Sequence, residues 1–174
     1  MLIIMAGLPG TGKSALAQRL AEGLPAVILD KDPIRAALFP TPLLEYSAQQ
    51  DDFCVGVMLQ VAEYILRKEP TRAVVLDGRT FSRRYQVETV AELAEKLGQP
   101  LAILECVCSD ATARQRLEQD VAQGSHLAQN RNFELYLAIK ARFEPIERPK
   151  LVIDTDQALA ACVEAGLAYL RSVG

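Results

Sequence analysis

The segment at residues 7–14, Gly-Leu-Pro-Gly-Thr-Gly-Lys-Ser, constrains the fold of this chain more than any other feature of the sequence. It matches the pattern GxxxxGK[ST], in which glycines allow backbone N–H groups to wrap around a chain of phosphates. The segment lies between a short apolar run, Leu2–Ala6, and a helical pattern that begins at Lys13. This strand–loop–helix context is the one that the motif requires. The sequence therefore predicts a phosphate-binding loop.

Each part of this loop has an expected contact with a nucleoside triphosphate. The loop N–H groups and the positive end of the following helix would hold the phosphates. Lys13 would reach the β- and γ-phosphates, and the Ser14 hydroxyl would be a ligand of Mg²⁺. We therefore expect ATP and Mg²⁺ as cofactors, with the binding residues Gly7, Leu8, Pro9, Gly10, Thr11, Gly12, Lys13, Ser14 and Ala15.

Short apolar runs alternate with helical patterns along the chain. The runs are rich in Val, Ile and Leu, and their length suits strands that are buried on both faces of a parallel sheet. They are Leu2–Ala6, Ala26–Asp30, Ala73–Asp77, Leu101–Val107 and Leu151–Asp154. Regular alternation of strands and helices predicts an α/β doubly wound fold. With 174 residues, the chain has the length of a single domain, 1–174.

The helical patterns have recognisable ends. Ser82 and Asp110 are expected N-caps, and Gly98 stands where the helix after Ser82 should stop. The longest pattern carries apolar residues at four-residue spacing, which predict a buried stripe: Phe53, Val57, Val61 and Ile65. The expected helices are Lys13–Glu22, Pro33–Phe39, Ala48–Lys68, Arg83–Leu97, Ala111–Gln123, Phe133–Arg142 and a last helix from Asp156 to about Arg171.

Composition argues against several classes of function. The chain has 19 basic and 22 acidic residues and a net charge of −3, which does not suit a protein whose main ligand is a nucleic acid. No apolar run approaches the ~20 residues that cross a bilayer, and the apolar start lacks the basic region of a signal peptide. The four cysteines form no CxxC pair and no metal-ligand spacing with the single histidine. We expect a soluble, cytoplasmic protein with free thiols, and the sequence gives no signal about its oligomeric state.

Aspartates stand at the ends of predicted strands, and ligands of such folds bind beyond the carboxyl ends of the strands. Asp30 and Asp32 are two residues apart and point to the same side. One could hold Mg²⁺ or its water, and the other could take the proton of an acceptor hydroxyl. Alternatively, Asp32 is only the N-cap of a helix that starts at Pro33. Asp77 is expected to orient the ligand shell of Mg²⁺ opposite Ser14. The alternative interpretation is that Asp77 is only a polar residue at the end of a strand.

Arginines follow the third predicted strand. Arg79 could grip an anionic substrate or the transferring phosphoryl group. Arg83 and Arg84 could do the same, but solvated surface charge explains them equally well.

The polar stretch Gln119–Asn132, flanked by Arg114, Arg116 and Arg131, belongs to a candidate lid at approximately 112–132. Closing Arg116 and Arg131 over ATP would exclude water and stabilise charge in the transition state. The alternative is an ordinary helical face with charge pairs. His126 lies in this stretch and is expected to be a surface or lid residue, not a catalytic one.

The phosphate loop, the pair Asp32-x-x-Arg35 and the strand end at Asp77 resemble the AAA_33-type P-loop kinases. That family includes the kinase domain of polynucleotide 5′-kinases, chloramphenicol phosphotransferase and the zeta toxins. The stretch Phe143-Glu144-Pro145, followed by residues 151–155, is similar to the closing part of such domains, so the resemblance covers nearly the whole chain. It implies a three-layer α/β/α P-loop NTPase fold with a five-stranded parallel sheet and a small helical lid. It also implies transfer from ATP-Mg²⁺ to a hydroxyl, with Asp32 as the general base and Arg35 as a contact to substrate or phosphate.

The lid departs from the family pattern. Similar proteins often carry Arg-Leu-x-x-Arg, whereas this chain reads Arg116-Leu117-Glu118-Gln119-Asp120. Arg114 or Arg131 must then replace the second arginine, or the lid works differently. Shikimate and gluconate kinases are the nearest rivals, because Asp30-x-Asp32 is similar to the carboxylate pair of shikimate kinase. The Gly-Gly-Gly stretch of that enzyme is missing, and Asp77-Gly78-Arg79-Thr80 stands in its place.

These features together predict a kinase that transfers the γ-phosphate of ATP, with Mg²⁺, to a hydroxyl of a small-molecule acceptor. The expected catalytic residues are Lys13, Asp32, Arg35, Arg116 and Arg131. The expected metal ligands are Ser14 and Asp77, and the expected substrate contacts are Asp30, Asp32, Arg35 and Arg79. Two alternatives stay open: a nucleotide-binding regulatory ATPase with little or no kinase activity, and a kinase of nucleic-acid 5′ ends, which would need a basic groove leading to Asp32.

Overall fold

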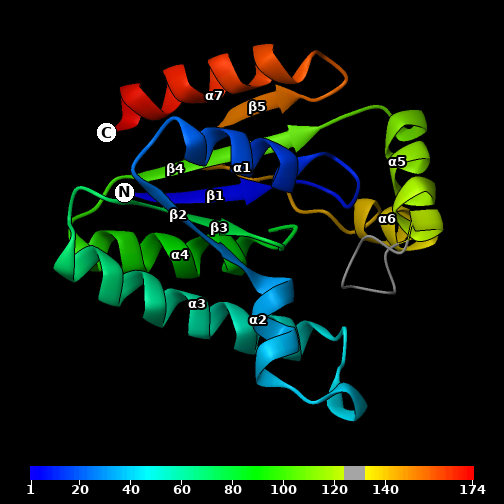
Figure 1. The fold of residues 1–174 in the computed structure, drawn as a ribbon, viewed down its shortest axis with the longest axis horizontal. Helices are drawn as coiled ribbons and strands as arrows, with labels where there is room; N and C mark the ends of the chain where they lie inside the picture. The colour runs from blue at the N-terminus through cyan, green and yellow to red at the C-terminus, as the bar shows by residue number, and fades with distance from the viewer. Residues whose placement is uncertain (124–131) are drawn as a thin grey trace.

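The computed structural model describes residues 1–123 and 132–174 of the chain and centres on one parallel sheet (Figure 1). Within these residues the sheet has five strands in the order β2-β3-β1-β4-β5, and every neighbouring pair is parallel. The strands are β1 (Leu2–Ala6), β2 (Ala26–Asp30), β3 (Ala73–Asp77), β4 (Leu101–Val107) and β5 (Leu151–Asp154). The predicted α/β class and the five-stranded parallel sheet are confirmed.

The register of the strands brings their carboxyl ends to one edge of the sheet. β1 is central, so the loop that follows it has neighbours on both sides. Asp30 at the end of β2 is the register partner of Asp77 at the end of β3. β3 in turn pairs directly with β1. Two strand-end aspartates therefore stand side by side on one flank of the loop after β1.

Helices cover both faces of the sheet and give the predicted three layers (Figure 1). One face carries α1 (Lys13–Glu22) and α7 (Leu159–Val173), and the other carries α3 (Ala48–Lys68) and α4 (Arg84–Leu97). The remaining helical elements are α2 (Lys31–Leu38), a 3₁₀ turn η1 (Thr41–Leu43), α5 (Asp110–Gln123) and α6 (Phe133–Lys140). α5 and α6 lie beyond the carboxyl ends of the strands, next to the phosphate loop.

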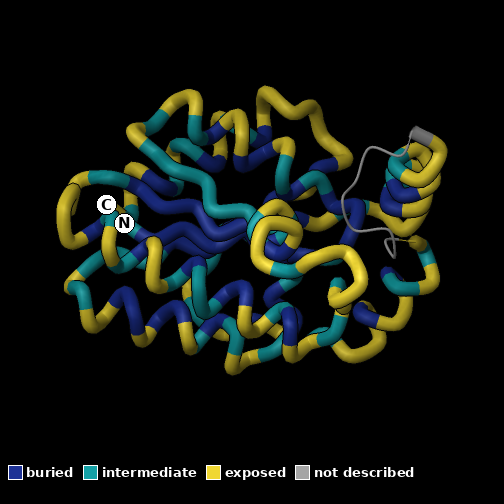
Figure 2. Tube along the Cα trace, turned by 60° about the horizontal axis from the view of Figure 1, so that its bottom comes forward, coloured by how far each residue is buried: buried dark blue, intermediate teal, exposed yellow. Residues whose placement is uncertain are grey.

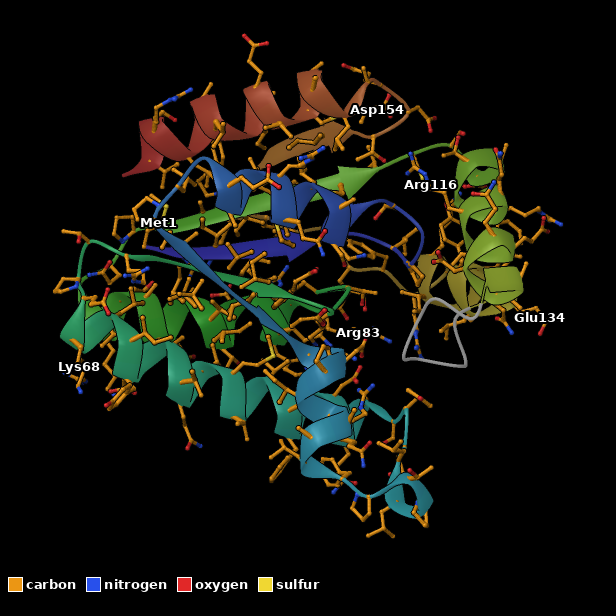
Figure 3. The ribbon with its side chains drawn as sticks, viewed as in Figure 1. Met1, Lys68, Arg83, Arg116, Glu134 and Asp154 are labelled. Atoms are coloured by element: carbon orange, nitrogen blue, oxygen red, sulfur yellow. The ribbon has the colours of Figure 1, made fainter. Side chains whose placement is uncertain are left out.

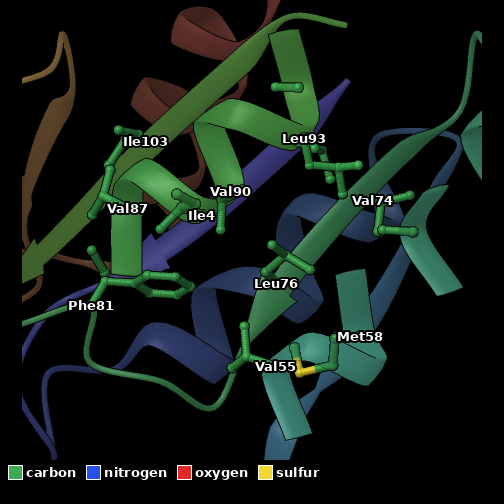
Figure 4. Packing of buried hydrophobic residues seen from close by; sticks show 14 of the residues in the cluster. Ile4, Val55, Met58, Val74, Leu76, Phe81, Val87, Val90, Leu93 and Ile103 are labelled. Carbon is green, nitrogen blue, oxygen red and sulfur yellow. The ribbon is translucent and has the colours of Figure 1, made fainter. Parts of the chain in front are cut away.

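The buried residues form a core on each face of the sheet, with β1 and β3 as the buried centre of the molecule (Figure 2). The edge strands β2 and β5 are only partly buried, which differs from the prediction of burial on both faces. Successive side chains of a strand point to opposite faces. Ile4 and Leu76 therefore join the core under α3 and α4 (Figure 4), while Ile3 and Val75 join the core under α1 and α7. Each such side chain contributes about 1.5–3 kcal/mol when it is fully buried. Packing from both sides thus fixes the end of β1, where the phosphate loop begins.

The buried face of α3 differs from the prediction. Phe53 and Val61 of the predicted stripe are 57% and 38% exposed. The buried residues of the helix are Gln50, Cys54, Val55, Met58, Ala62 and Leu66. The series from Cys54 to Leu66 has the same four-residue spacing, shifted by one position. Both series are apolar, and packing against β3 and α4, which the sequence does not encode locally, selects the second.

Several helix starts are shifted because other residues cap them. α2 starts at Lys31, and its N-cap is Asp30, whose carboxylate accepts a hydrogen bond from the N–H of Asp32 at 3.0 Å. The alternative that Asp32 is the N-cap is therefore wrong. The N-cap of α4 is Arg83 and not Ser82; its N–H donates to the side chain of Gln86 at 3.2 Å.

The ends of the remaining helices also differ slightly. α5 includes the predicted cap residue Asp110, because the hydroxyl of Ser109 accepts from the N–H of Thr112 at 3.2 Å. α7 starts three residues after Asp156, at Leu159. Gly98 ends α4 with a left-handed φ of 59°, as predicted.

α5 and α6 pack against each other and against the phosphate loop. Leu117 and Tyr136 are buried in a small cluster that also contacts Leu8 of the loop. The Tyr136 hydroxyl donates to Asp110 at the start of α5 at 2.6 Å. Two predicted lid residues, Arg131 and His126, lie outside the described residues.

The cysteines agree with the expectation of free thiols. All four cysteines are free thiols, and burial raises the pKa of Cys106 to about 12, which keeps this thiol protonated. Among residues 1–123 and 132–174, no helix has the length and apolar content needed to span a membrane.

Candidate active site

Three glycines allow the sharp turn of the phosphate loop between β1 and α1. Gly7, Gly10 and Gly12 have φ values of 132°, 77° and 76°, which L-residues rarely adopt. A β-carbon on Gly7 would lie 2.2 Å from the carbonyl oxygen of Cys106 on β4. The loop can follow this path only with glycine at position 7.

Gly7→Ala is expected to lower the free energy of unfolding by about 3 kcal/mol or more, because the new side chain is strained in φ and clashes with the Cys106 carbonyl. Gly98→Ala is the matched control, since φ is 59° there and, apart from its chain neighbours, no atom of the described residues lies within 4 Å of an added β-carbon. It should cost only about 1 kcal/mol. Urea unfolding measures both values. Equal losses in the two variants would contradict the role of the close approach.

Hydrogen bonds to two other segments hold the loop in shape. The N–H of Gly7 donates to the carbonyl of Thr80, after β3, at 3.0 Å. On the opposite flank the hydroxyl of Thr155, after β5, donates to the carbonyl of Thr11 at 3.0 Å. The loop is therefore tied to the segments that follow the strands on both sides of β1.

Lys13 lies inside the curl of this loop. Its Nζ donates to the carbonyl oxygens of Gly7 at 2.9 Å and Leu8 at 2.7 Å, and the residue is only 8% exposed. Ser14 and Ala15 follow it in the first turn of α1. A buried ammonium group at the start of a helix, next to loop N–H groups, is suited to bind the phosphates of a nucleotide.

Asp77 supplies an oxygen suited to a divalent cation. The residue is 2% exposed, and its Oδ1 has no hydrogen-bond partner among the described residues. Leaving such an atom buried without a partner is unfavourable. Mg²⁺ is commonly held by one or two protein ligands together with phosphate oxygens. The described part of the chain has no cluster of three or more Asp, Glu, His or Cys residues that could hold a metal ion without such phosphate oxygens. Asp77 and Ser14 therefore fit a Mg²⁺ ion that binds together with the nucleotide.

Asp30 stands beside Asp77 at the same edge of the sheet. Burial raises the pKa of Asp30, and the nearby carboxylates of Asp77 and Asp32 raise it further, against the hydrogen bond from the Asp32 N–H. Gly78 makes this close arrangement possible, because a β-carbon there would lie 2.5 Å from the Asp30 Oδ1. In this structure Asp30 acts as the cap of α2.

Asp32 belongs to a compact cluster of four charges. Its Oδ1 lies 3.0 Å from Lys31 Nζ and 3.1 Å from Arg35 Nη1, and its side chain is 11% exposed. Asp51, from the first turn of α3, pairs with the same two cations: its Oδ1 lies 2.7 Å from Lys31 Nζ and also contacts Arg35 Nη2. Burial lowers the pKa of Lys31, and Asp32 opposes that shift. The cluster fixes the orientation of the Asp32 carboxylate.

Arg79, which the sequence predicts as a substrate contact, is buried just after β3. It already has an acidic partner in this structure. Its Nη2 forms an ion pair with Asp52 of α3. The Tyr85 hydroxyl also donates to Asp52, at 2.9 Å from Oδ2. The sequence does not single out Asp51, Asp52 or Tyr85, because they lie in the segments Thr41–Gln60 and Phe81–Tyr85, which carry no diagnostic motif. Their only local signal is a pair of adjacent acids near the start of a helix.

Arg116 reaches the phosphate loop from the opposite side (Figure 3). Its Nη1 lies 3.4 Å from the carbonyl oxygen of Gly10 and 3.0 Å from the hydroxyl of Thr155, and Nη2 donates to the Thr155 carbonyl at 2.8 Å. Thr155 is a further residue that the sequence analysis missed. It joins the loop, α5 and the segment after β5.

The other arginines considered from the sequence have different partners. Arg83 pairs with Glu144 at 2.9 Å, and Arg84 with Glu147 at 2.6 Å. These pairs hold the start of α4 to the segment after α6. Arg114 places its Cζ 4.0 Å from the centre of the Phe133 ring and so joins α5 to α6.

A family model described as an AAA domain matches residues 2–146 of the chain. The match spans the phosphate loop, Asp32, Asp77 and Arg116. None of the curated proteins matches the chain.

Several solved structures are similar over almost the whole chain. A gluconokinase from Sinorhizobium meliloti 1021 has a TM-score of 0.71 and 17% identity, covering 98% of this chain and 91% of that chain. The Mycobacterium tuberculosis APS kinase CysC, in complex with AMPPNP and APS, has a TM-score of 0.70 and 16% identity, with 98% and 96% covered. Chaetomium thermophilum Kti12, in complex with ADP-AlF3, has a TM-score of 0.75 and 14% identity, with 99% and 98% covered. At these identities the similarity establishes a shared fold.

Proposed function

The chain belongs to the AAA domain family, and from that premise we propose that it is an ATP-dependent, Mg²⁺-assisted phosphotransferase that acts on a hydroxyl of a small-molecule acceptor. The gluconokinase and the APS kinase with the same fold are named for small-molecule substrates. The nucleotide analogue in the APS kinase and the ADP-AlF3 in Kti12 support a nucleotide in this fold. Four free thiols suit the reducing cytoplasm, where we place the protein.

The observation that carries this proposal is the position of Lys13 in the phosphate loop. The loop is tied on one flank to Thr80, three residues after the strand end Asp77, and on the other to Thr155 and Arg116. Charge-stabilising groups thus converge on the place where a γ-phosphate would lie. Phosphoryl transfer needs this arrangement, because positioning and charge stabilisation supply most of its catalysis.

The loop N–H groups, Lys13 and Arg116 would hold the phosphates and stabilise the charge that develops during transfer. A Mg²⁺ ion, when bound, would neutralise charge on the β- and γ-phosphates, with Ser14 and Asp77 as its protein ligands. Arg116 belongs to the segment at approximately 112–132, which we propose as the lid of a single domain formed by residues 1–174. Its closure over the nucleotide would exclude water from the reaction.

Asp32 would act as the general base toward the acceptor. The acceptor oxygen attacks the γ-phosphorus while its proton passes to the Asp32 carboxylate. The bond between the γ-phosphorus and the oxygen that bridges it to the β-phosphorus breaks, and ADP leaves with that oxygen. Arg35 is bound to Asp32 at 3.1 Å and would hold the carboxylate in line for this step.

The surroundings of Asp32 favour a small molecule over a nucleic-acid end. Binding a polyanion needs exposed Lys and Arg side chains. Lys31, Arg35 and Arg79 are instead buried and paired with carboxylates. The described residues around Asp32 therefore provide no exposed basic groove.

A regulatory ATPase remains the second candidate because of Asp120, which stands where the resembling kinases carry an arginine. ATP isotopically labelled at the γ-phosphate distinguishes the two functions. We expect a mixture of metabolites and wild-type protein to move the label into an organic phosphate ester. Label found only in inorganic phosphate would contradict the kinase and favour the regulatory ATPase.

A further inference from the structure

Acids from the start of α3 cover the cations near Asp32. The side chains of Lys31, Arg35 and Arg79 are 7%, 2% and 4% exposed. The side chains of their partners Asp51 and Asp52 are 27% and 43% exposed. A molecule that approaches Asp32 from solvent therefore meets carboxylates before it meets a positive charge.

The guanidinium group of Arg35 is occupied at two of its three nitrogens. Nη1 donates to Asp32 at 3.1 Å, and Nη2 pairs with Asp51. The ring centre of Tyr46 lies 5.1 Å from the Arg35 Cζ. The Arg35 Nε is buried and has no hydrogen-bond partner among the described residues. A guanidinium has five N–H groups, so Arg35 keeps donors for the oxygens of an acceptor, but its single positive charge is already shared by the carboxylates of Asp32 and Asp51.

Arg79 is neutralised in the same way. Its Nη2 is paired with Asp52, whose second oxygen accepts from the Tyr85 hydroxyl at 2.9 Å. Its Nε is buried and has no partner within residues 1–123 and 132–174. Each arginine thus presents a buried donor, while its positive charge is already balanced by an acid of α3.

We propose that Asp51 and Asp52 are specificity-determining residues, and that the acceptor is a hydroxyl compound without a carboxylate, sulfate or phosphate group. This inference rests on the proposed function, because it concerns the acceptor of the same site. An acidic acceptor would have to displace Asp51 or Asp52 from a guanidinium and lie close to the displaced carboxylate. Like charges at such a distance repel each other, so the neutral compound of the same shape binds better.

Asp52→Asn tests the inference in a variant expected to fold, because Asp52 is partly exposed. The protein is saturated with AMP-PNP and Mg²⁺, so that the phosphate loop is filled, and is titrated with D-gluconate or D-sorbitol at matched ionic strength. The two probes differ by a carboxylate in place of a hydroxymethyl group. We expect wild-type protein to bind gluconate no more tightly than sorbitol. Asp52→Asn should bind gluconate about tenfold more tightly than wild type does, with sorbitol binding unchanged.

The double variant Asp52→Asn/Arg79→Gln is the matched control and should lose the gain. Preference of the wild type for gluconate over sorbitol would overturn the inference, and that comparison needs no variant. Absence of a gain in Asp52→Asn would also overturn it.

The titration involves no turnover, so the two proposals can fail separately. A gain in gluconate binding without any label transfer from ATP would contradict the proposed function alone. Label transfer to acidic acceptors as efficient as to their neutral counterparts would overturn the specificity inference and leave the kinase standing.

Discussion

Replacing Lys13 with alanine is expected to reduce phosphoryl transfer by about a thousandfold or more. The ammonium group lies inside the loop, held by the carbonyl groups of Gly7 and Leu8 at 2.9 and 2.7 Å. In the proposed reaction the ammonium group contacts the β- and γ-phosphates. There it stabilises the negative charge that develops during transfer. Alanine removes this charge from a site that is nearly closed to solvent, so water cannot replace it. Initial rates at several ATP concentrations measure the loss.

Lys68→Ala is the matched control for Lys13→Ala. Lys68 is the last residue of α3, with its Nζ 4.7 Å from the ring centre of Tyr64, and its loss should leave the rate unchanged. Circular dichroism of both variants confirms that each is folded. Near-normal turnover by folded Lys13→Ala would refute the assignment of the phosphate loop as the nucleotide site.

Asp32→Asn is expected to abolish most of the transfer while ATP affinity is largely kept. The amide cannot take the proton of the acceptor hydroxyl, and general-base catalysis contributes about 10²–10⁴-fold. The structure places Asp32 in the charge cluster with Lys31, Arg35 and Asp51, apart from the loop residues that would bind phosphates. Turnover measures the first quantity, and titration with a fluorescent ATP analogue measures the second.

Asp154→Asn serves as the control for Asp32→Asn, because it changes another strand-end aspartate. Asp154 ends β5 at the opposite edge of the sheet (Figure 3) and accepts from the N–H of Asp156 at 3.0 Å. The Asp154→Asn variant should transfer the phosphoryl group at the wild-type rate. Equal losses of turnover and of ATP affinity in Asp32→Asn would mean that Asp32 has a structural role.

The strands could be predicted from the sequence because each is a short, mainly apolar run, and three of the five end in aspartate. All five predicted runs match the observed strands from first to last residue. The phosphate loop was equally predictable, since its glycines, lysine and serine are contiguous. In such segments the local sequence and the tertiary structure favour the same conformation.

The acid partners in the site could not be predicted, because they come from distant parts of the chain. Asp51 and Asp52 are 16 and 27 residues from Arg35 and Arg79, and Thr155 is 144 residues from Thr11. Only the crossing of α3 over the ends of β2 and β3 and the path of the chain after β5 bring these pairs together. The buried face of α3 was wrong for a related reason: two apolar series fit the helix, and tertiary packing chose between them.

An acceptor screen tests the central claim most directly. Wild-type protein and Asp32→Asn are each incubated with ATP, Mg²⁺ and a metabolite mixture, and mass spectrometry records every compound that gains a phosphoryl group. We predict that at least one hydroxyl compound is phosphorylated by the wild type and stays unmodified with Asp32→Asn. Conversion of ATP to ADP and inorganic phosphate with no phosphorylated compound, or the same products from both proteins, would contradict a hydroxyl kinase with Asp32 as its base.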